Sequence, residues 1–236
     1  VDPVAVELTK KRIYDISGFD NSNIKVADFF DVAVLSNSKE YDYIFTNPPW
    51  GKKIDKKVKE EIGNILNART SLDTCSLFLF ACLKSLKKDG VLGLLLPEAF
   101  FNISTFAEAR LCALNYYIQR LIDYGKPFKG LVTKAQGIVL LKKPRQQNDF
   151  VSCSSSDHTF KREISSFLEN PKSILNLYCS NEDAKVMSYL LSIPHITLKN
   201  RARWGLGIVT GNNKKFIKDK ETPNLIPIFK GSDIIS

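Results

Sequence analysis

A run of six apolar residues, Val91–Leu96 (VLGLLL), constrains the fold of this chain most strongly. A continuous apolar strand of this kind is buried on both faces, which requires covering elements on either side of its sheet. Residues 73–88 precede it with apolar residues at helical spacing, and Asp89-Gly90 follows, which predicts a helix closed by a turn. A buried strand that follows an amphipathic helix indicates an α/β fold with a parallel sheet.

The same alternation extends to both sides of this strand. Two earlier strands are expected at 24–27 and 41–46, and the second of these (YDYIFT) is rich in strand-forming residues. Downstream, the pattern predicts a helix over 104–114 and strands over 118–123 and 137–141.

The composition changes after the last of these strands. Residues 144–159 are rich in Gln, Asn, Asp and Ser, which predicts a loop at the edge of the α/β unit. A helix is expected over 181–192, with Ser180 or Asn181 as its N-cap. Three parts are therefore predicted: a core over 1–145, a connecting segment over 146–200, and the start of a further region over 201–236.

Bulk composition excludes several classes of protein. The chain has 236 residues, 44% of them hydrophobic, which suffices for one sizeable core. Neither a long apolar run nor a signal-peptide pattern occurs, so we expect a soluble, cytoplasmic protein without membrane contact. Five widely spaced cysteines and two histidines argue against a disulfide framework, a zinc site or a histidine triad. The net charge of +9 is compatible with a polyanionic partner, and equally with solubility alone.

The residues that point most directly to chemistry are Asn47-Pro48-Pro49-Trp50, directly after the strand at 41–46. In open α/β sheets, ligands bind beyond the carboxyl ends of the strands. The two prolines stiffen this loop and leave backbone carbonyls without N–H groups, and the Asn side chain adds a further acceptor. Two converging acceptors suit an amino group, and the Trp offers a flat face for a ring. The alternative is a simple turn at a strand end, which the following aromatic residue disfavours.

Asn47–Trp50 matches the (N/D)-P-P-(Y/F/W) motif of the γ-type adenine-N6 DNA methyltransferases, and the sequence resembles that family over most of its length. The family includes N-6 DNA methylases of type II and IIG restriction–modification systems. The resemblance implies a Rossmann-like class I methyltransferase sheet, S-adenosylmethionine as cofactor and double-stranded DNA as substrate. It also implies that the three predicted parts are a catalytic core, a connecting segment and the start of a target-recognition region.

Further matches assign roles by the same resemblance. Asp2 looks like part of the family's second-strand motif, and Asp28-Phe29 looks like the element whose aspartate binds the cofactor's adenine. Phe128 falls where the family has a second aromatic residue that holds the flipped base. Trp204–Phe216 and Phe229–Ile234 resemble the start of the target-recognition region, which favours DNA over protein glutamine as substrate. For Asp28, the structural alternative is a turn or N-cap aspartate.

One departure from the family pattern affects the cofactor site. The family's Gly-rich loop and ribose-binding acid are not found upstream, since the sequence begins at Val1. Gly205-Leu206-Gly207 is a poor substitute, because no helix pattern follows it. We therefore expect a fragment whose sheet is incomplete at its N-terminus. A restriction or specificity subunit is a possible partner by the same resemblance.

The resemblance implies that Asn47 and Pro48 grip the adenine amine, with Asn47 also beside the cofactor, and that Trp50 and Phe128 stack on the base. No metal or nucleophile is required for this transfer. Lysines follow the motif and are expected either to be solvated or to contact DNA phosphates: Lys52, Lys53, Lys56, Lys57 and Lys59. Two alternative functions stay open: an RNA or protein (glutamine) amine methyltransferase, and a non-catalytic nucleic-acid-binding subunit with a degenerate methylase fold.

Overall fold

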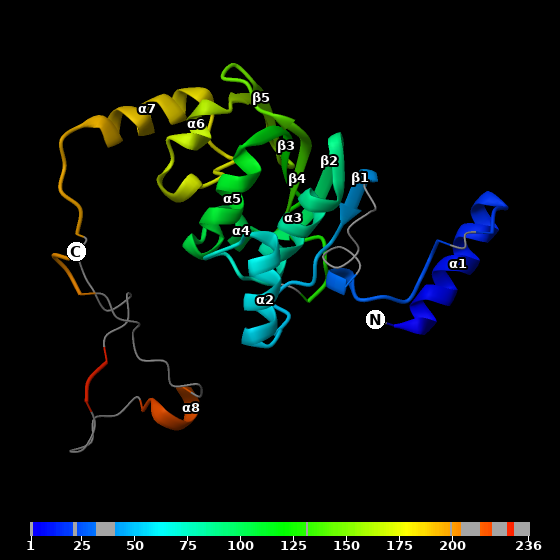
Figure 1. The fold of residues 1–236 in the computed structure, drawn as a ribbon. Helices are drawn as coiled ribbons and strands as arrows, with labels where there is room; N and C mark the ends of the chain where they lie inside the picture. The colour runs from blue at the N-terminus through cyan, green and yellow to red at the C-terminus, as the bar shows by residue number, and fades with distance from the viewer. Residues whose placement is uncertain are drawn as a thin grey trace. The chain divides into compact units, whose positions relative to one another are not determined.

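Six strands form one mixed sheet in the computed structural model of the chain, in the order β1-β2-β4-β3-β5-β6 (Figure 1). The strands are β1 (Tyr41–Thr46), β2 (Leu86–Pro97), β3 (Tyr116–Asp123), β4 (Ala135–Pro144), β5 (Phe150–Ser154) and β6 (Thr159–Glu163). β1 is parallel to β2 and β3 is parallel to β5, whereas the pairs β2–β4, β3–β4 and β5–β6 are antiparallel. The α/β fold is confirmed, but the prediction of a parallel sheet is wrong. Parallel neighbours need a crossover, whereas the described residues between β3 and β4 contain no helix.

The structure describes residues 2–20, 23–31, 41–130, 132–198, 200–203, 213–218 and 226–228. The chain separates into two compact units, Val1–Ile193 and Pro194–Ser236. The first unit contains the sheet, and the described helix of the second is α8 (Asn213–Phe216). Among the described helices, none combines the length and apolarity needed to cross a bilayer.

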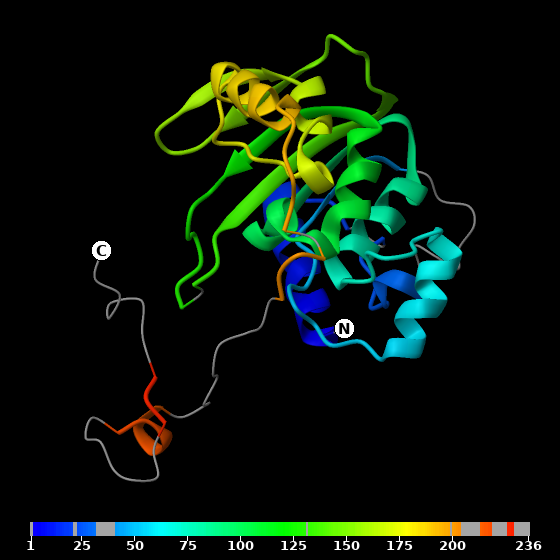
Figure 2. The same cartoon turned by 90° about the vertical axis from the view of Figure 1, so that its left-hand side faces the viewer.

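Helices of the first unit are mostly short. They are α1 (Pro3–Ser17), α2 (Lys56–Leu66), α3 (Thr74–Ser85), α4 (Glu98–Asn102), α5 (Ala107–Leu114), α6 (Ser165–Leu168) and α7 (Asn181–Ser192), with 3-10 turns η2 (Ser104–Phe106) and η3 (Pro171–Ser173). α3 packs on β2 and α5 on β3, so that both lie along one face of the sheet (Figures 1 and 2). The N-cap of α3 is Asp73, whose side chain accepts the Cys75 N–H, and nine of the twelve helix residues are buried.

The core lies between this helical layer and the central strands. Leu92, Leu94 and Leu96 of β2 point into it with exposed fractions of at most 3%, as do Ile138 and Leu140 of β4. The inward leucines recur at every second residue of β2, and this fixes the register, since a shift by one residue would turn the whole set to the opposite face. The loop after β1 and the connection between β3 and β4 therefore begin at the ends of a well-packed sheet.

Several elements agree with the sequence pattern. β1 has the predicted bounds, and β2, β3 and β4 each contain the predicted strand and extend it. The helix expected over 104–114 is present as η2 followed by α5. α7 spans the predicted residues, with Ser180 as its N-cap. The Ser180 hydroxyl accepts the Asp183 N–H and the Asp183 carboxylate accepts the Ser180 N–H, which is a capping box.

Three expectations about local structure are wrong. Residues 24–27 do not form a strand, because β1 pairs only with β2 within the described part of the chain and offers them no ladder. The helix expected to 88 ends at Ser85, because the fully buried Leu86 adopts an extended conformation and begins β2. Residues 144–159 are not a plain loop: they contain β5, whose Val151 and Cys153 alternate into the core, so the sheet continues past the predicted edge.

Candidate active site

Four strand ends meet at one edge of the sheet. The carboxyl ends of β1 and β2 lie side by side because the two strands are parallel. β4 starts at this edge, with Ala135 opposite Pro97, and β3 ends there, with Asp123 opposite Gln136. The edge therefore collects the loop after β1 and the β3–β4 connection, which Figure 2 shows extending past the strands.

The tetrapeptide Asn47–Trp50 leaves β1 at this edge. The Asn47 side chain is exposed, and it forms no hydrogen bond with any residue that the structure describes. Pro48 is buried and Pro49 is exposed, so the loop is anchored on one side and open on the other. The carboxamide of Asn47 is therefore free to bind a ligand at the edge of the sheet.

The two aromatic residues singled out from the sequence lie together. The rings of Trp50 and Phe128 meet edge to face, with centroids 6.0 Å apart and an interplanar angle of 78°. Trp50 is half-buried against the main core, and its Nε1 donates a hydrogen bond to the Leu95 carbonyl across 3.3 Å. In this arrangement the rings touch, so a base held between them would have to separate them.

A pocket of about 570 Å³ opens beside the same loop. Asp28 and Phe29 contribute to its lining, and Pro49 of the tetrapeptide contributes as well. The aromatic part of the wall is rigid, because Phe29 stacks on Phe78 with centroids 4.0 Å apart and Phe30 meets both rings edge-on. The volume falls in the range typical of small-molecule sites.

The pocket lining fits an adenosyl group. Asp28 is exposed and presents a carboxylate, which accepts hydrogen bonds from an exocyclic amine. Ile54 and Ile62 add apolar wall that suits the face of a purine. An adenosyl group needs an acceptor for its amine and an apolar wall for its ring, and the Asp28 carboxylate and the two isoleucines supply these.

Asp28 also has a structural role. Its Oδ1 accepts the N–H of Phe30 across 2.9 Å, which is the turn or cap that the sequence left open as the alternative. A carboxylate has two oxygens and about four lone-pair directions, so this bond leaves room for a ligand. The two roles are compatible at one residue.

The lysines after the motif divide into two sets. Lys52 and Lys53 line the pocket, so they lie at the candidate site. Lys56 forms an exposed ion pair with Glu60, 3.7 Å apart on α2, and the backbone N–H of Lys57 is capped by Asp55. Lys52 and Lys53 are therefore the better candidates for contact with a ligand or with phosphate.

Asp2 is not among the residues that line either the pocket or the aromatic pair. It is the N-cap of α1, where its Oδ1 accepts the Val4 N–H across 2.9 Å. Most of Trp204–Phe216 and all of Phe229–Ile234 lie outside the described residues.

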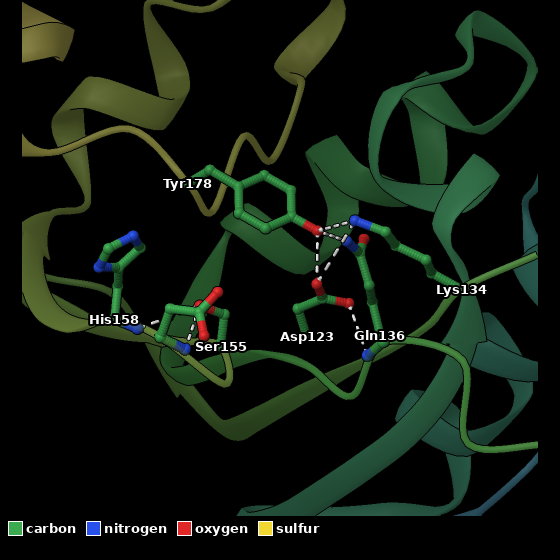
Figure 3. A network of polar contacts seen from close by, with 8 residues as sticks. Asp123, Lys134, Gln136, Ser155, His158 and Tyr178 are labelled. Atoms are coloured by element: carbon green, nitrogen blue, oxygen red, sulfur yellow. Dashed lines mark hydrogen bonds and ion pairs between the residues drawn. The ribbon is translucent and has the colours of Figure 1, made fainter.

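Sequence reasoning missed a polar cluster at the same edge. Tyr178, from the segment before α7, bonds to Asp123 at the end of β3 and to Gln136 of β4 (Figure 3). Asp123 is the last residue of β3 and follows Leu121 and Ile122, and a carboxylate at the end of a strand is a signal that the sequence contains. Tyr178 carries no such signal, because only the tertiary fold brings it there.

Comparison with known proteins identifies the family. Residues 2–129 match the model of the Eco57I restriction-modification methylases. The chain is 48% identical to the Type II methyltransferase M.VspI of Vibrio sp. (strain 343) over 99% of its own length, and it spans 57% of that relative. It also resembles a chain in a solved type I R-M system, with a TM-score of 0.52 at 18% identity, covering 80% of this chain and 37% of that one. The family expected from the motif is thereby confirmed: the chain belongs to the Eco57I restriction-modification methylase family.

Proposed function

We propose that the protein containing this chain is a site-specific DNA methyltransferase that transfers a methyl group from S-adenosylmethionine to the exocyclic amine (N6) of adenine. One observation carries the proposal: the Asn47–Trp50 loop touches two sites at once. Its Pro49 lines the pocket of Asp28, while its Trp50 contacts Phe128. One loop thus borders both the pocket proposed for the cofactor's adenosyl group and the aromatic pair proposed for the target adenine, so it would bring the two adenines close together.

The Asn47 carboxamide oxygen and the Pro48 carbonyl oxygen would make the target amine a better nucleophile. The lone pair of that nitrogen is delocalised into the ring, which makes it a weak nucleophile. Two acceptors for its hydrogens pull the nitrogen toward tetrahedral geometry and localise the lone pair. S-adenosylmethionine, held at the pocket that Asp28 and Phe29 line, would supply an electrophilic methyl group, and its sulfur would leave as the thioether of S-adenosylhomocysteine. The nitrogen then loses a proton to water, and the acceptors contribute by positioning and polar stabilisation.

The target base has to leave the double helix to reach this loop, because the amine is inaccessible inside a base stack. Trp50 and Phe128 would hold the extruded base by stacking, which contributes about 1–3 kcal/mol per base. Lys52 and Lys53 would contact phosphates next to the extruded nucleotide. Asp28 would accept the amine of the cofactor's adenine, and Phe29 would shape the wall beside it.

The relatives favour a restriction–modification setting. The curated relative is named a Type II methyltransferase, and the matched family is described as restriction-modification methylases. We therefore infer that double-stranded DNA is the substrate, that a restriction or specificity subunit is a potential partner, and that the protein works in the cytoplasm.

Transfer of a labelled methyl group by the full-length protein tests this proposal. The protein is incubated with labelled S-adenosylmethionine and, in parallel, with double-stranded DNA, RNA and a protein mixture, and modified nucleosides are separated after digestion. We expect label in N6-methyladenine from DNA alone. Label in RNA or in glutamine would support an amine methyltransferase of another substrate class. Binding of DNA without transfer would support the non-catalytic subunit.

A further inference from the structure

Four side chains meet at the base of the β3–β4 connection, and we call them the Tyr178 cluster: Asp123, Lys134, Gln136 and Tyr178 (Figure 3). The Tyr178 hydroxyl donates to Asp123 Oδ2 across 2.6 Å and accepts from Gln136 Nε2 at 3.1 Å. Lys134 Nζ lies 3.2 Å from the same hydroxyl and 3.8 Å from Asp123 Oδ2. The reaction proposed above uses none of these four groups.

The cluster holds both ends of the connection. Asp123 uses its second oxygen, Oδ1, to accept the N–H of Gly125 across 3.0 Å. Gly125 has φ of 64°, a left-handed conformation that glycine adopts without a side-chain penalty, and its carbonyl accepts the Ala135 N–H. Lys134 is the last residue before β4, so the ammonium that reaches Tyr178 belongs to the returning end.

The connection carries Phe128 at its outer part. Pro127 directly precedes Phe128, and its ring fixes the backbone angle φ at that residue. The two residues between Gly125 and Phe128 therefore have little conformational freedom. Phe128 is 38% exposed, and its ring meets Trp50 of the motif. Exposed loops are mobile unless tertiary contacts hold them, and the anchor at the base supplies such contacts to the loop that carries this ring.

Tyr178 comes from outside the sheet. It lies between the buried residue Leu177 and the start of α7, so the core fixes its backbone. Partial burial, and then the bond to Asp123, raise the pKa of Tyr178, so the phenol remains a donor at neutral pH. The Lys134 ammonium also lies 5.2 Å from the centroid of the Tyr178 ring. The hydroxyl therefore joins the segment that leads into α7 to the loop that carries Phe128.

We propose that the Tyr178 cluster is a positioning device for the target base: Tyr178, through Asp123, fixes the β3–β4 connection so that Phe128 is directed at Trp50. Tyr178 is thus a positioning residue and touches no reacting atom. This inference rests on the proposed function and extends it from the motif to a residue beyond β6.

The experiment compares wild type, Tyr178→Phe and the matched control Tyr189→Phe in the full-length protein. Tyr189 lies on α7 with an exposed fraction of 67%, so its hydroxyl gives a control of identical chemistry. Two duplexes carry the site that the wild type methylates: one has the target adenine and serves to measure kcat, and the other has 2-aminopurine in its place and serves only to measure fluorescence on base extrusion. We expect Tyr178→Phe to lower kcat about tenfold and to reduce the rise in 2-aminopurine emission, with the affinity for S-adenosylmethionine unchanged. Tyr189→Phe should match the wild type.

A double-mutant cycle separates positioning from a general loss of stability. If Tyr178 acts through Phe128, then Tyr178→Phe adds no further loss of kcat in the Phe128→Ala background. Lys134→Met, a change at a partly exposed side chain of the same cluster, should lower kcat in the same direction. Wild-type emission and kcat in both Tyr178→Phe and Lys134→Met, or fully additive losses in the cycle, would overturn the inference. A wild type that methylates no adenine would instead refute the proposed function, and the inference with it.

Discussion

The indole nitrogen of Trp50 donates a hydrogen bond to the backbone carbonyl of Leu95, which ties the end of one strand to its parallel neighbour. A phenylalanine in this position would keep a stacking face but could not make that bond. The bond restricts the orientation of the indole ring, which also contacts the Phe128 ring. The fourth residue of the motif therefore has two separable roles, orientation and stacking.

Replacing Trp50 separates these roles in DNA binding by the full-length protein. Trp50→Leu removes both the stacking face and the bond, so we expect a loss of about 1–3 kcal/mol in affinity for DNA with an extruded or mismatched target base. Trp50→Phe keeps the face and should lose less. Titration of both variants with labelled duplex measures the difference. Equal affinity of Trp50→Leu and wild type would exclude stacking.

Asp28 is best tested by two substitutions, because it both caps a backbone N–H and faces the pocket. Asn caps as well as Asp does but has only one acceptor oxygen, whereas Ala removes both functions. We expect Asp28→Asn and Asp28→Ala to weaken S-adenosylmethionine binding alike, by roughly 1.5–3 kcal/mol in calorimetric titration. Asp20→Asn, at an exposed aspartate outside the pocket, is the control. Should Asp28→Asn bind as tightly as the wild type, Asp28 would be a cap alone.

Lys52 and Lys53 predict a change in the salt dependence of DNA binding. Neutralising both in Lys52→Gln/Lys53→Gln removes up to two phosphate contacts, so the slope of log K against log salt should become shallower by about 2. The control pair is Lys84→Gln/Lys88→Gln, two exposed lysines near the opposite end of β2. Equal slopes for the two double variants would mean that Lys52 and Lys53 are simply solvated.

Glu108 gives a prediction about stability that is independent of the site. Its carboxylate, on α5, accepts the backbone N–H groups of Arg69, Thr70 and Ser71 and the Thr70 hydroxyl, at 2.6–3.1 Å. Burial alone raises the pKa of Glu108, but these donors outweigh it and hold the pKa below its usual value. We expect Glu108→Gln to lower the free energy of unfolding at pH 7 by about 1–2 kcal/mol, since the group is only partly buried.

The sign of the pH dependence follows from this depressed pKa. The stabilisation by Glu108 is fully present above the pKa of the unfolded chain, about 4.3, and is lost as the pH falls through the lower pKa of the folded state. Urea unfolding at several pH values should therefore show the gap between wild type and Glu108→Gln closing in acid. Glu61→Gln, at an exposed residue of α2, serves as the control. A gap that does not change with pH would contradict the assignment.

The sequence pattern was sufficient wherever local periodicity and burial agree. The strand β1 and the helix α7 with Ser180 as its N-cap are local features, and the structure has both of them. β5 was missed because its inward residues, Val151 and Cys153, alternate with serines that resemble a loop. The mixed direction of the sheet was missed because it depends on which strands pair, and no single segment encodes this.

The candidate site divides in the same way. The family resemblance predicts that Trp50 and Phe128 stack on the target base, and the structure places the two rings in contact with each other. The contacts of Tyr178 were not expected, because it reaches Asp123 across 55 positions of the chain through tertiary packing alone. The edge-to-face contact of the aromatic pair also could not be read from the sequence, since it depends on how the two loops pack in three dimensions.

Asn47 carries the central claim, because its exposed carboxamide, which bonds to no residue that the structure describes, is the acceptor that would activate the amine. The decisive measurement is methyl transfer to DNA by full-length wild type, Asn47→Ala and the control Asn64→Ala, an exposed asparagine of α2, with S-adenosylmethionine binding measured in parallel. We predict that Asn47→Ala binds the cofactor but forms no N6-methyladenine, while Asn64→Ala behaves as the wild type. Undiminished formation of N6-methyladenine by Asn47→Ala would contradict the account.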